Sequence, residues 1–141
     1  MNYYKLSKKN YTQYKTLIKS NITEEFFYDF IDNTLNENHI IIVLEDEKEN
    51  IIGSGTIIIE KKLTYGGCNM GHIENILIDE KYRGQRYGEK LVNVLLEICA
   101  KKKCYRVDLN CNEELEQFYN KSGFTKKHLC MNIYFKENFS K

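Results

Sequence analysis

A short segment with two arginines and two glycines lies between a β-branched stretch and a stretch with helical periodicity. Its residues are Arg83, Gly84, Gln85, Arg86, Tyr87 and Gly88. The first backbone N–H groups of a helix have no partner within it, and the helix dipole adds to their attraction for an anion. Glycine lacks a Cβ, so a phosphate can approach the main chain closely at Gly84 and Gly88. We therefore predict that residues 83–88 bind a pyrophosphate.

Two commoner phosphate-binding loops do not fit this spacing. A Walker loop carries Lys and then Ser or Thr after its second glycine, whereas Glu89 and Lys90 follow Gly88. A dinucleotide-binding fingerprint needs Gly-x-Gly-x-x-Gly, and Arg86 stands where its second glycine belongs. Two interpretations stay open on local chemistry alone: an anion-binding turn of another kind, or a surface turn that glycine merely tightens.

The elements that must position this segment follow from hydrophobic periodicity. Helical spacing predicts helices over residues 11–18, 24–35, 89–103 and 113–122. β-Branched and alternating runs predict strands over residues 3–6, 40–45, 51–60, 70–78, 106–111 and 130–135. Gly53 and Gly55 interrupt the third of these strands and indicate a bulge or a twist. The order β-α-α-β-β-β-α-β-α-β predicts an α+β fold, a mixed and mostly antiparallel sheet flanked by helices, in one domain over residues 1–141.

Composition argues against several functional classes. The formal net charge of +1 gives no global attraction to nucleic acid or to an anionic membrane. No apolar stretch approaches the ~20 residues that span a bilayer, and the N-terminus lacks the apolar core of a secretory signal. Five cysteines without framework spacing indicate free thiols, so we expect a cytoplasmic protein. The three histidines are scattered and no Cys-x-x-Cys pair exists, so we expect no metal site.

The stretch 73–124 resembles the conserved region of the GNAT superfamily of N-acetyltransferases. The mark of that superfamily is Gln/Arg-x-x-Gly-x-Gly/Ala between a strand and a helix, answered here by Arg83 and Gly88, with Arg86 in place of the usual fourth-position glycine. Four shorter segments resemble the glucosamine 6-phosphate N-acetyltransferase family more closely. They are residues 71–74, 82–84, 104–105 and 118–124.

The resemblance implies acetyl-CoA as co-substrate and direct transfer to an amine in a ternary complex. In similar enzymes the pantetheine arm lies along the strand that here contains Ile76, Leu77 and Ile78, whose main-chain groups would pair with it. The tyrosine of the Phe-Tyr helix faces the leaving thiolate, so Tyr119 would donate a proton or a hydrogen bond to sulfur. Without the resemblance, the pair Phe118-Tyr119 is more typical of a hydrophobic core.

Residues for the acceptor substrate are implied in the same way. Glu74 is the nearest matching carboxylate and would accept the amine proton or orient the substrate; the alternative is a solvated strand residue. Asn75 stands where close relatives usually carry Asp, and Asn110 stands where they often carry an acid. Lys62 suits a sugar phosphate, and Tyr134 matches a position where relatives tend to place a phosphate-binding Arg.

The reaction that this resemblance implies is N-acetylation of glucosamine 6-phosphate for UDP-N-acetylglucosamine synthesis. It also implies a homodimer with an acceptor pocket across the interface, in which residues 133–135 are available for strand exchange. Three alternatives stay open: a GNAT enzyme for another amine or a protein terminus, a non-catalytic acyl-CoA-binding module, and a covalent route through Cys111, since thiolates are good nucleophiles.

Overall fold

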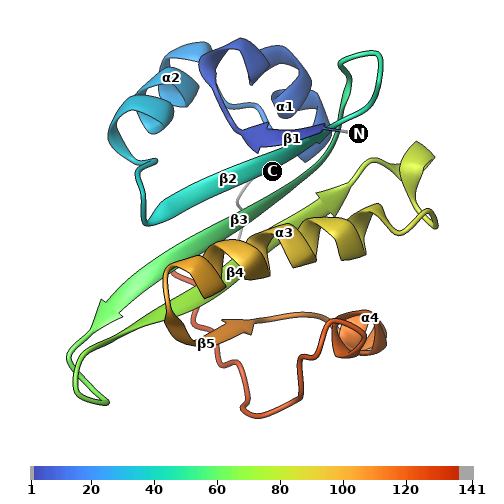
Figure 1. Cartoon of the computed structure of the whole chain (residues 1–141). Helices are drawn as coiled ribbons and strands as arrows, with labels where there is room; N and C mark the ends of the chain where they lie inside the picture. Colours follow the sequence, from blue (N-terminus) through green and yellow to red (C-terminus); the bar gives the residue numbers. More distant parts are fainter. Residues whose placement is uncertain (1, 137–141) are drawn as a thin grey trace.

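A computed structural model describes residues 2–136 of the chain (Figure 1). A five-stranded sheet with strand order β1-β2-β3-β4-β5 runs through the molecule. The strands are β1 (Asn2–Lys5), β2 (His39–Glu45), β3 (Ile51–Lys62), β4 (Cys68–Ile78) and β5 (Cys104–Leu109). Neighbouring strands from β1 to β4 pair in antiparallel fashion, and β5 pairs with β4 in parallel. The predicted mixed, mostly antiparallel sheet is confirmed.

Four α-helices accompany the sheet within residues 2–136. They are α1 (Tyr11–Ile18), α2 (Glu24–Asn33), α3 (Tyr87–Lys101) and α4 (Glu116–Asn120). Short 3₁₀ turns precede α1, α3 and α4 over Lys8–Asn10, Glu80–Tyr82 and Glu113–Leu115. None of the helices described is long and apolar enough to cross a membrane.

The apolar run of β2 explains why helices cover both faces of the sheet. Side chains alternate along a strand, so a continuous run of apolar residues serves two cores. Ile42 and Leu44 pack in the cluster that contains Leu95 of α3, whereas Val43 packs in the cluster that contains Phe27 of α2. Figure 1 shows α3 lying along the sheet, apart from α1 and α2. The sheet is thus the middle layer between α3 and the α1–α2 pair.

The start of α2 follows its sequence signals. The Thr23 side chain accepts a hydrogen bond from the Phe26 N–H at 3.0 Å, which satisfies one of the free donors of the first turn. Glu24 and Glu25 place negative charge where the helix dipole favours it. Here the predicted N-cap is confirmed.

The predicted strand over residues 130–135 is wrong for the single chain. No ladder joins this segment to any strand within residues 2–136, and it has no regular secondary structure. Its alternating apolar side chains are 83–97% exposed: Leu129, Met131, Ile133 and Phe135. A strand needs a partner for its backbone, and the apolar alternation finds none inside one copy of the chain. The strand predicted over residues 106–111 is also shifted, because β5 begins and ends two residues earlier.

Candidate acyl-CoA site

Strands β4 and β5 separate near the middle of β4. Their parallel ladder runs from the pair Asn69↔Cys104 to the pair Ile73↔Leu109, while β4 itself continues to Ile78. Figure 1 shows the chain leaving β5 toward α4 while β4 runs on in another direction. The part of β4 beyond Ile73 therefore has no strand partner on its β5 side among residues 2–136. An extended ligand can pair with the main chain there, at the predicted pantetheine residues Ile76, Leu77 and Ile78.

A bulge in β4 lies at the point of divergence. Ser54 pairs with Leu77 and Thr56 pairs with Glu74, so that Gly55 alone lies opposite Asn75 and Ile76. Asn75 has a φ of 54°, in the left-handed region that asparagine tolerates better than most residues. A bulge bends its strand and re-aims the residues after it. The interruption predicted from the glycines of β3 is confirmed, and the extra residue lies on the partner strand.

Gly55 also sets how closely α3 approaches this bulge. A Cβ at this position would lie 2.8 Å from Ile76 Cδ1 and 3.0 Å from Leu95 Cδ1. Both contacts are too short for carbon atoms, so the absence of a side chain lets α3 pack directly over the bulge.

The segment between β4 and α3 exposes a row of free amides. No residue in the described part of the chain accepts a hydrogen bond from the backbone N–H groups of residues 84–89. Two of these residues, Gly84 with a φ of 78° and Arg86 with a φ of 65°, adopt left-handed conformations. They turn the chain sharply into the first turn of α3, where the helix dipole is positive. This is the geometry that the sequence predicted for a pyrophosphate site.

The two glycines of this segment have different structural roles. Nothing lies within 4 Å of a Cβ built on Gly84, so its surroundings are open to a ligand. A Cβ on Gly88 would meet the ring of Phe118 at 3.0 Å. Gly88 therefore permits close packing between the start of α3 and α4. From the sequence, both glycines were assigned either to the approach of a ligand or to the tightness of a turn, and the contact with α4 was not predicted.

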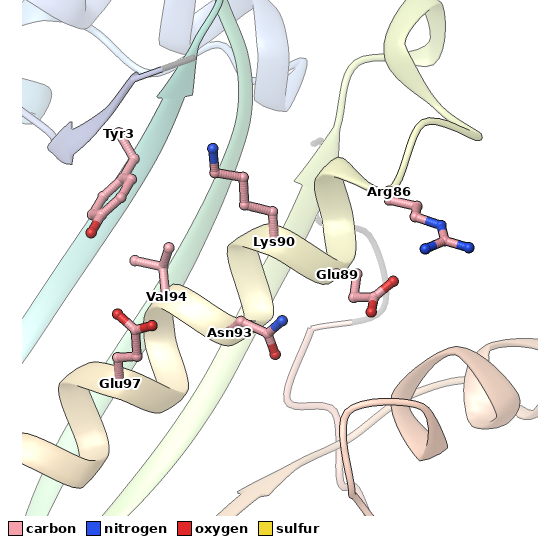
Figure 2. Close-up of a pocket in the computed structure, with 7 residues that line it drawn as sticks. All are labelled: Tyr3, Arg86, Glu89, Lys90, Asn93, Val94 and Glu97. Carbon is pink, nitrogen blue, oxygen red and sulfur yellow. The ribbon is translucent and has the colours of Figure 1, made fainter.

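The arginines of the segment also differ. Arg83 donates a hydrogen bond from Nε to the carbonyl oxygen of Ile78 at 3.1 Å, which ties the segment to the end of β4. Arg86 is the left-handed N-cap residue of α3, which explains why a glycine is usual at this position of the superfamily signature. Figure 2 shows its side chain extending away from Tyr3, whereas Lys90 reaches toward Tyr3.

A shallow groove of about 380 Å³ lies between β1 and α3 (Figure 2). Its lining residues are Tyr3, Arg86, Glu89, Lys90, Asn93, Val94 and Glu97. Because β1 and β5 are the two opposite edge strands of the sheet, this groove lies away from the divergence of β4 and β5. Its walls carry both signs of charge, and none of the predicted acceptor residues lines it.

Tyr119 is buried where α4 packs, with 8% of its surface exposed. Its ring meets Phe118 edge-on at a centroid distance of 4.8 Å and Phe124 at 6.1 Å. Burial, with a smaller effect of the Cys111 thiol, raises the pKa of Tyr119 above 10.0. Its hydroxyl makes no hydrogen bond to a residue in the described range. The phenol is therefore protonated at neutral pH and free to donate.

The predicted acceptor residues fall into two groups. Glu74 on β4 and Asn110 just after β5 are the first residues beyond the end of the β4–β5 ladder, and both are exposed. Asn75 is the bulge residue beside Glu74. Lys62 lies at the end of β3, with its Nζ 3.9 Å from a Glu60 carboxylate oxygen. Tyr134 lies in the exposed C-terminal segment, and no described interaction joins it to the others.

A polar cluster that was not predicted from the sequence lies beside these residues. His72 Nδ1 lies 2.6 Å from an Asp108 oxygen, and His72 Nε2 lies 2.9 Å from a Glu60 oxygen. The three residues come from β4, β5 and β3 and are far apart in sequence. The only sequence signal was alternation, which puts His72 and Glu74 on the same face of β4.

Cys111 directly follows Asn110 and is exposed. No histidine or carboxylate in the described part of the chain is hydrogen-bonded to its thiol, so no base for a covalent route is in place. Nor do residues 2–136 contain a group of three or more His, Cys, Asp or Glu side chains that could hold a metal ion.

The diverging strands, the bulge and the free amides before α3 leave main-chain groups available to an extended, anionic ligand. The chain belongs to the acetyltransferase (GNAT) family, whose model matches residues 3–124. This finding confirms the resemblance seen in the sequence and the predicted fold class.

Two individual proteins within this family are similar to the chain. A probable glucosamine 6-phosphate N-acetyltransferase of rice is 38% identical over 104 residues, which cover 72% of this chain and 63% of that protein. The glucosamine 6-phosphate N-acetyltransferase of Arabidopsis thaliana is 35% identical over 122 residues, 85% of this chain and 82% of that protein. The chain thus matches just under two thirds of the rice protein's length.

A solved structure agrees with these matches. The crystal structure of glucosamine-6-phosphate N-acetyltransferase from Arabidopsis thaliana superposes with a TM-score of 0.90 and 30% sequence identity. The superposition covers 96% of this chain and 98% of that one.

Proposed function

We propose that this protein transfers the acetyl group of acetyl-CoA to the amine of glucosamine 6-phosphate, yielding N-acetylglucosamine 6-phosphate for UDP-N-acetylglucosamine synthesis. The observation that carries the proposal is the row of unpartnered backbone amides over residues 84–89, beside the unpaired end of β4. Support for the acceptor comes from the names of the relatives, which are glucosamine 6-phosphate N-acetyltransferases.

The free main chain holds the co-substrate. Backbone N–H groups of residues 84–89 donate to the diphosphate, and the charge of Arg86 lies close by. Ile76, Leu77 and Ile78 pair with the pantetheine arm through their backbone groups, as a missing strand would. Acetyl-CoA supplies an acetyl group activated as a thioester, and a backbone N–H of β4 polarises its carbonyl.

Tyr119 serves the leaving group. Its phenol is buried, keeps its proton at neutral pH and has no competing acceptor among residues 2–136. A donor of this kind stabilises sulfur as negative charge develops on it during direct transfer in a ternary complex. Apolar packing against Phe118 and Phe124 fixes the ring, so the hydroxyl is the only part free to act.

Glu74 and Asn110 serve the acceptor. The attacking amine must be neutral, so a carboxylate that takes up its proton, directly or through water, favours the reaction. Glu74 supplies that carboxylate, while Asn75 and Asn110 offer amide groups to sugar hydroxyls. Lys62 at the end of β3 supplies a cation for the phosphate, and Tyr134 supplies a hydroxyl there.

The protein acts as a homodimer in the cytoplasm. Support for the dimer comes from the alternating apolar side chains of the C-terminal segment, Leu129, Met131, Ile133 and Phe135, which one copy leaves exposed. A second copy would cover them and bring Tyr134 into its acceptor pocket. Support for the cytoplasm comes from the five cysteines, which are all free thiols. Light scattering at micromolar concentration tests the dimer: twice the chain mass supports it, and a stable single-chain mass refutes it.

Release of free CoA with a panel of amines tests the reaction. Acetyl-CoA turnover should be fastest with glucosamine 6-phosphate and much slower with unphosphorylated glucosamine, because Lys62 and its neighbours recognise the phosphate. Equal rates for the two sugars would remove the phosphate from the proposal. Faster turnover with a polyamine, an aminoglycoside or a peptide N-terminus would assign another acceptor. Coenzyme-dependent thermal stabilisation without turnover of any amine would leave a binding module.

A further inference from the structure

One histidine bridges three adjacent strands at the edge of the proposed acceptor site. His72 of β4 contacts Asp108 of β5 at 2.6 Å through Nδ1 and Glu60 of β3 at 2.9 Å through Nε2. The imidazole side chain is 28% exposed, and the two carboxylates are about half exposed. Both ring nitrogens are thus within hydrogen-bond distance of a carboxylate oxygen.

The bridge lies next to the point where β4 and β5 separate. His72 pairs directly with Asp108 in the parallel ladder, and the following pair, Ile73↔Leu109, is the last one. Beyond it come Glu74 on β4 and Asn110, the first residue after β5. Side chains alternate along a strand, so His72 and Glu74 share one face of the sheet. Gly71 and Ile73 face α3, so the bridge lies on the opposite face.

We propose that His72 is a positioning residue, which links β3, β4 and β5 through Glu60 and Asp108 and thereby holds Glu74 and Asn110 at the spacing that the acceptor amine requires. The proposal rests on the proposed function for the identity of the acceptor. Two contacts on one ring resist both a sliding of β5 along β4 and a widening of the split between them. This side-chain link reinforces the main-chain ladder one pair before the ladder ends.

The bridge depends on the protonation state of His72. An imidazolium donates from both nitrogens, whereas a neutral imidazole donates from one and turns a lone pair toward the other carboxylate. The charged groups around the ring are Glu60 and Asp108, then Lys62 at 3.9 Å from Glu60 and Arg106 at 3.9 Å from Asp108. All of them lie on the three strands of the bridge.

The sign of the pH dependence follows from these contacts. Burial lowers the pKa of His72, but the hydrogen bonds and charges of Asp108 and Glu60 outweigh it, so the pKa is raised above 6.5. A raised folded-state pKa means that the bridge is complete below the ordinary histidine pKa and weakens as the pH rises through the raised value. The positions of Glu74 and Asn110 should therefore change on the alkaline side.

The test compares His72→Gln with the wild type and with His39→Gln, a matched control on β2. Gln keeps one hydrogen bond and cannot titrate. The kcat/KM of H72Q for the acceptor should fall by about 10- to 100-fold, which is the effect of a misplaced reacting group. In the wild type kcat/KM should decline as the pH rises above the His72 pKa, and H72Q should not show this decline. CoA affinity should change by less than about twofold, because the amides of residues 84–89 are untouched. H39Q should resemble the wild type in every respect.

A second readout separates this proposal from the choice of acceptor. Backbone amide NMR signals of Glu74 and Asn110 should shift in H72Q and, in the wild type, move with pH along the His72 titration. Should H72Q fold poorly, Asp108→Asn removes one carboxylate charge and should move the same signals. Signals that stay fixed in a folded variant and across the titration overturn the positioning role, whatever amine is used. Failure of wild-type turnover with glucosamine 6-phosphate, with these shifts present, overturns the acceptor assignment instead.

Discussion

The interior strand β2 and the edge strand β5 have opposite surroundings. Strand β2 pairs with a strand on each side, and its side chains are buried on both faces, as Val43 and Leu44 show with no exposed surface. Around β5, the ladder stops at Leu109, the neighbouring strand is bulged, and the segment that follows α4 is exposed. The main-chain groups that have no partner beside β5 are available to the coenzyme that we propose.

The non-glycine residues with a positive φ also differ between the two regions. Lys19 and Lys103 take up left-handed conformations just after helices, where many chains do so. Asn75 does so inside a strand, and Arg86 does so at the N-cap of α3. The unusual conformations therefore lie beside the free amides and the split of β4 from β5, where they shape the site.

The largest expected effect is on catalysis beside the β5 edge, where α4 packs, with little effect on folding. Tyr119→Phe removes one hydroxyl and keeps the packed ring, so kcat should fall by about 100- to 10,000-fold while CoA binding is retained. Tyr105→Phe, at an exposed position on β5, is the matched control and should keep wild-type turnover. Measured CoA release that is the same for Y119F and the wild type would remove Tyr119 from the mechanism.

A substitution on the interior strand β2 should lower stability instead. Leu44 is fully buried, so Leu44→Ala should lower the free energy of unfolding by about 2–5 kcal/mol through lost burial and a residual cavity. Leu63, 98% exposed at the end of the β3–β4 hairpin, provides the same substitution without burial, and L63A should change stability by less than about 0.5 kcal/mol. Denaturant titration measures both. Similar values for the two variants would contradict the assignment of the core.

The smallest effect on stability should come from the packing contact between α3 and α4. Gly88→Ala puts a methyl group 3.0 Å from the Phe118 ring, and overpacking of this kind costs about 1–3 kcal/mol. Because Phe118 precedes Tyr119, turnover should also fall. Gly84→Ala has open space around it and suffers only from its left-handed φ, about 1 kcal/mol. A variant G88A that melts and turns over like the wild type would show that α4 does not depend on this contact.

Local sequence signals predicted strand β2 and helix α2 well. The apolar run of β2 and the Thr23 cap of α2 act within a few residues, so propensity and periodicity suffice to find them. Arg83 to Gly88 was predicted as an anion-binding turn from helix-terminus chemistry, and the free amides have the geometry for it. The resemblance to GNAT enzymes supplied what local chemistry left open, namely the family.

Features that depend on pairing between distant strands were not predictable in this way. The Glu60–His72–Asp108 bridge needs the register of three strands, and a one-residue shift would move His72 to the other face. The packing role of Gly88 depends on where α4 lies. The strand expected over residues 130–135 has the alternation of apolar and polar residues that a strand shows. Alternation predicts that one face of the segment is buried, but it does not identify the chain that buries it.

The most direct measurement follows the backbone amide NMR signals of residues 84–89 during titration with CoA. We expect these amide signals to shift together and to saturate at one dissociation constant. The amide signals of Ile76, Leu77 and Ile78 should shift with them, while the signals of β2 stay in place. Saturating CoA binding that leaves residues 84–89 unchanged, and instead moves Tyr3 and Val94 in the groove between β1 and α3, would contradict this expectation.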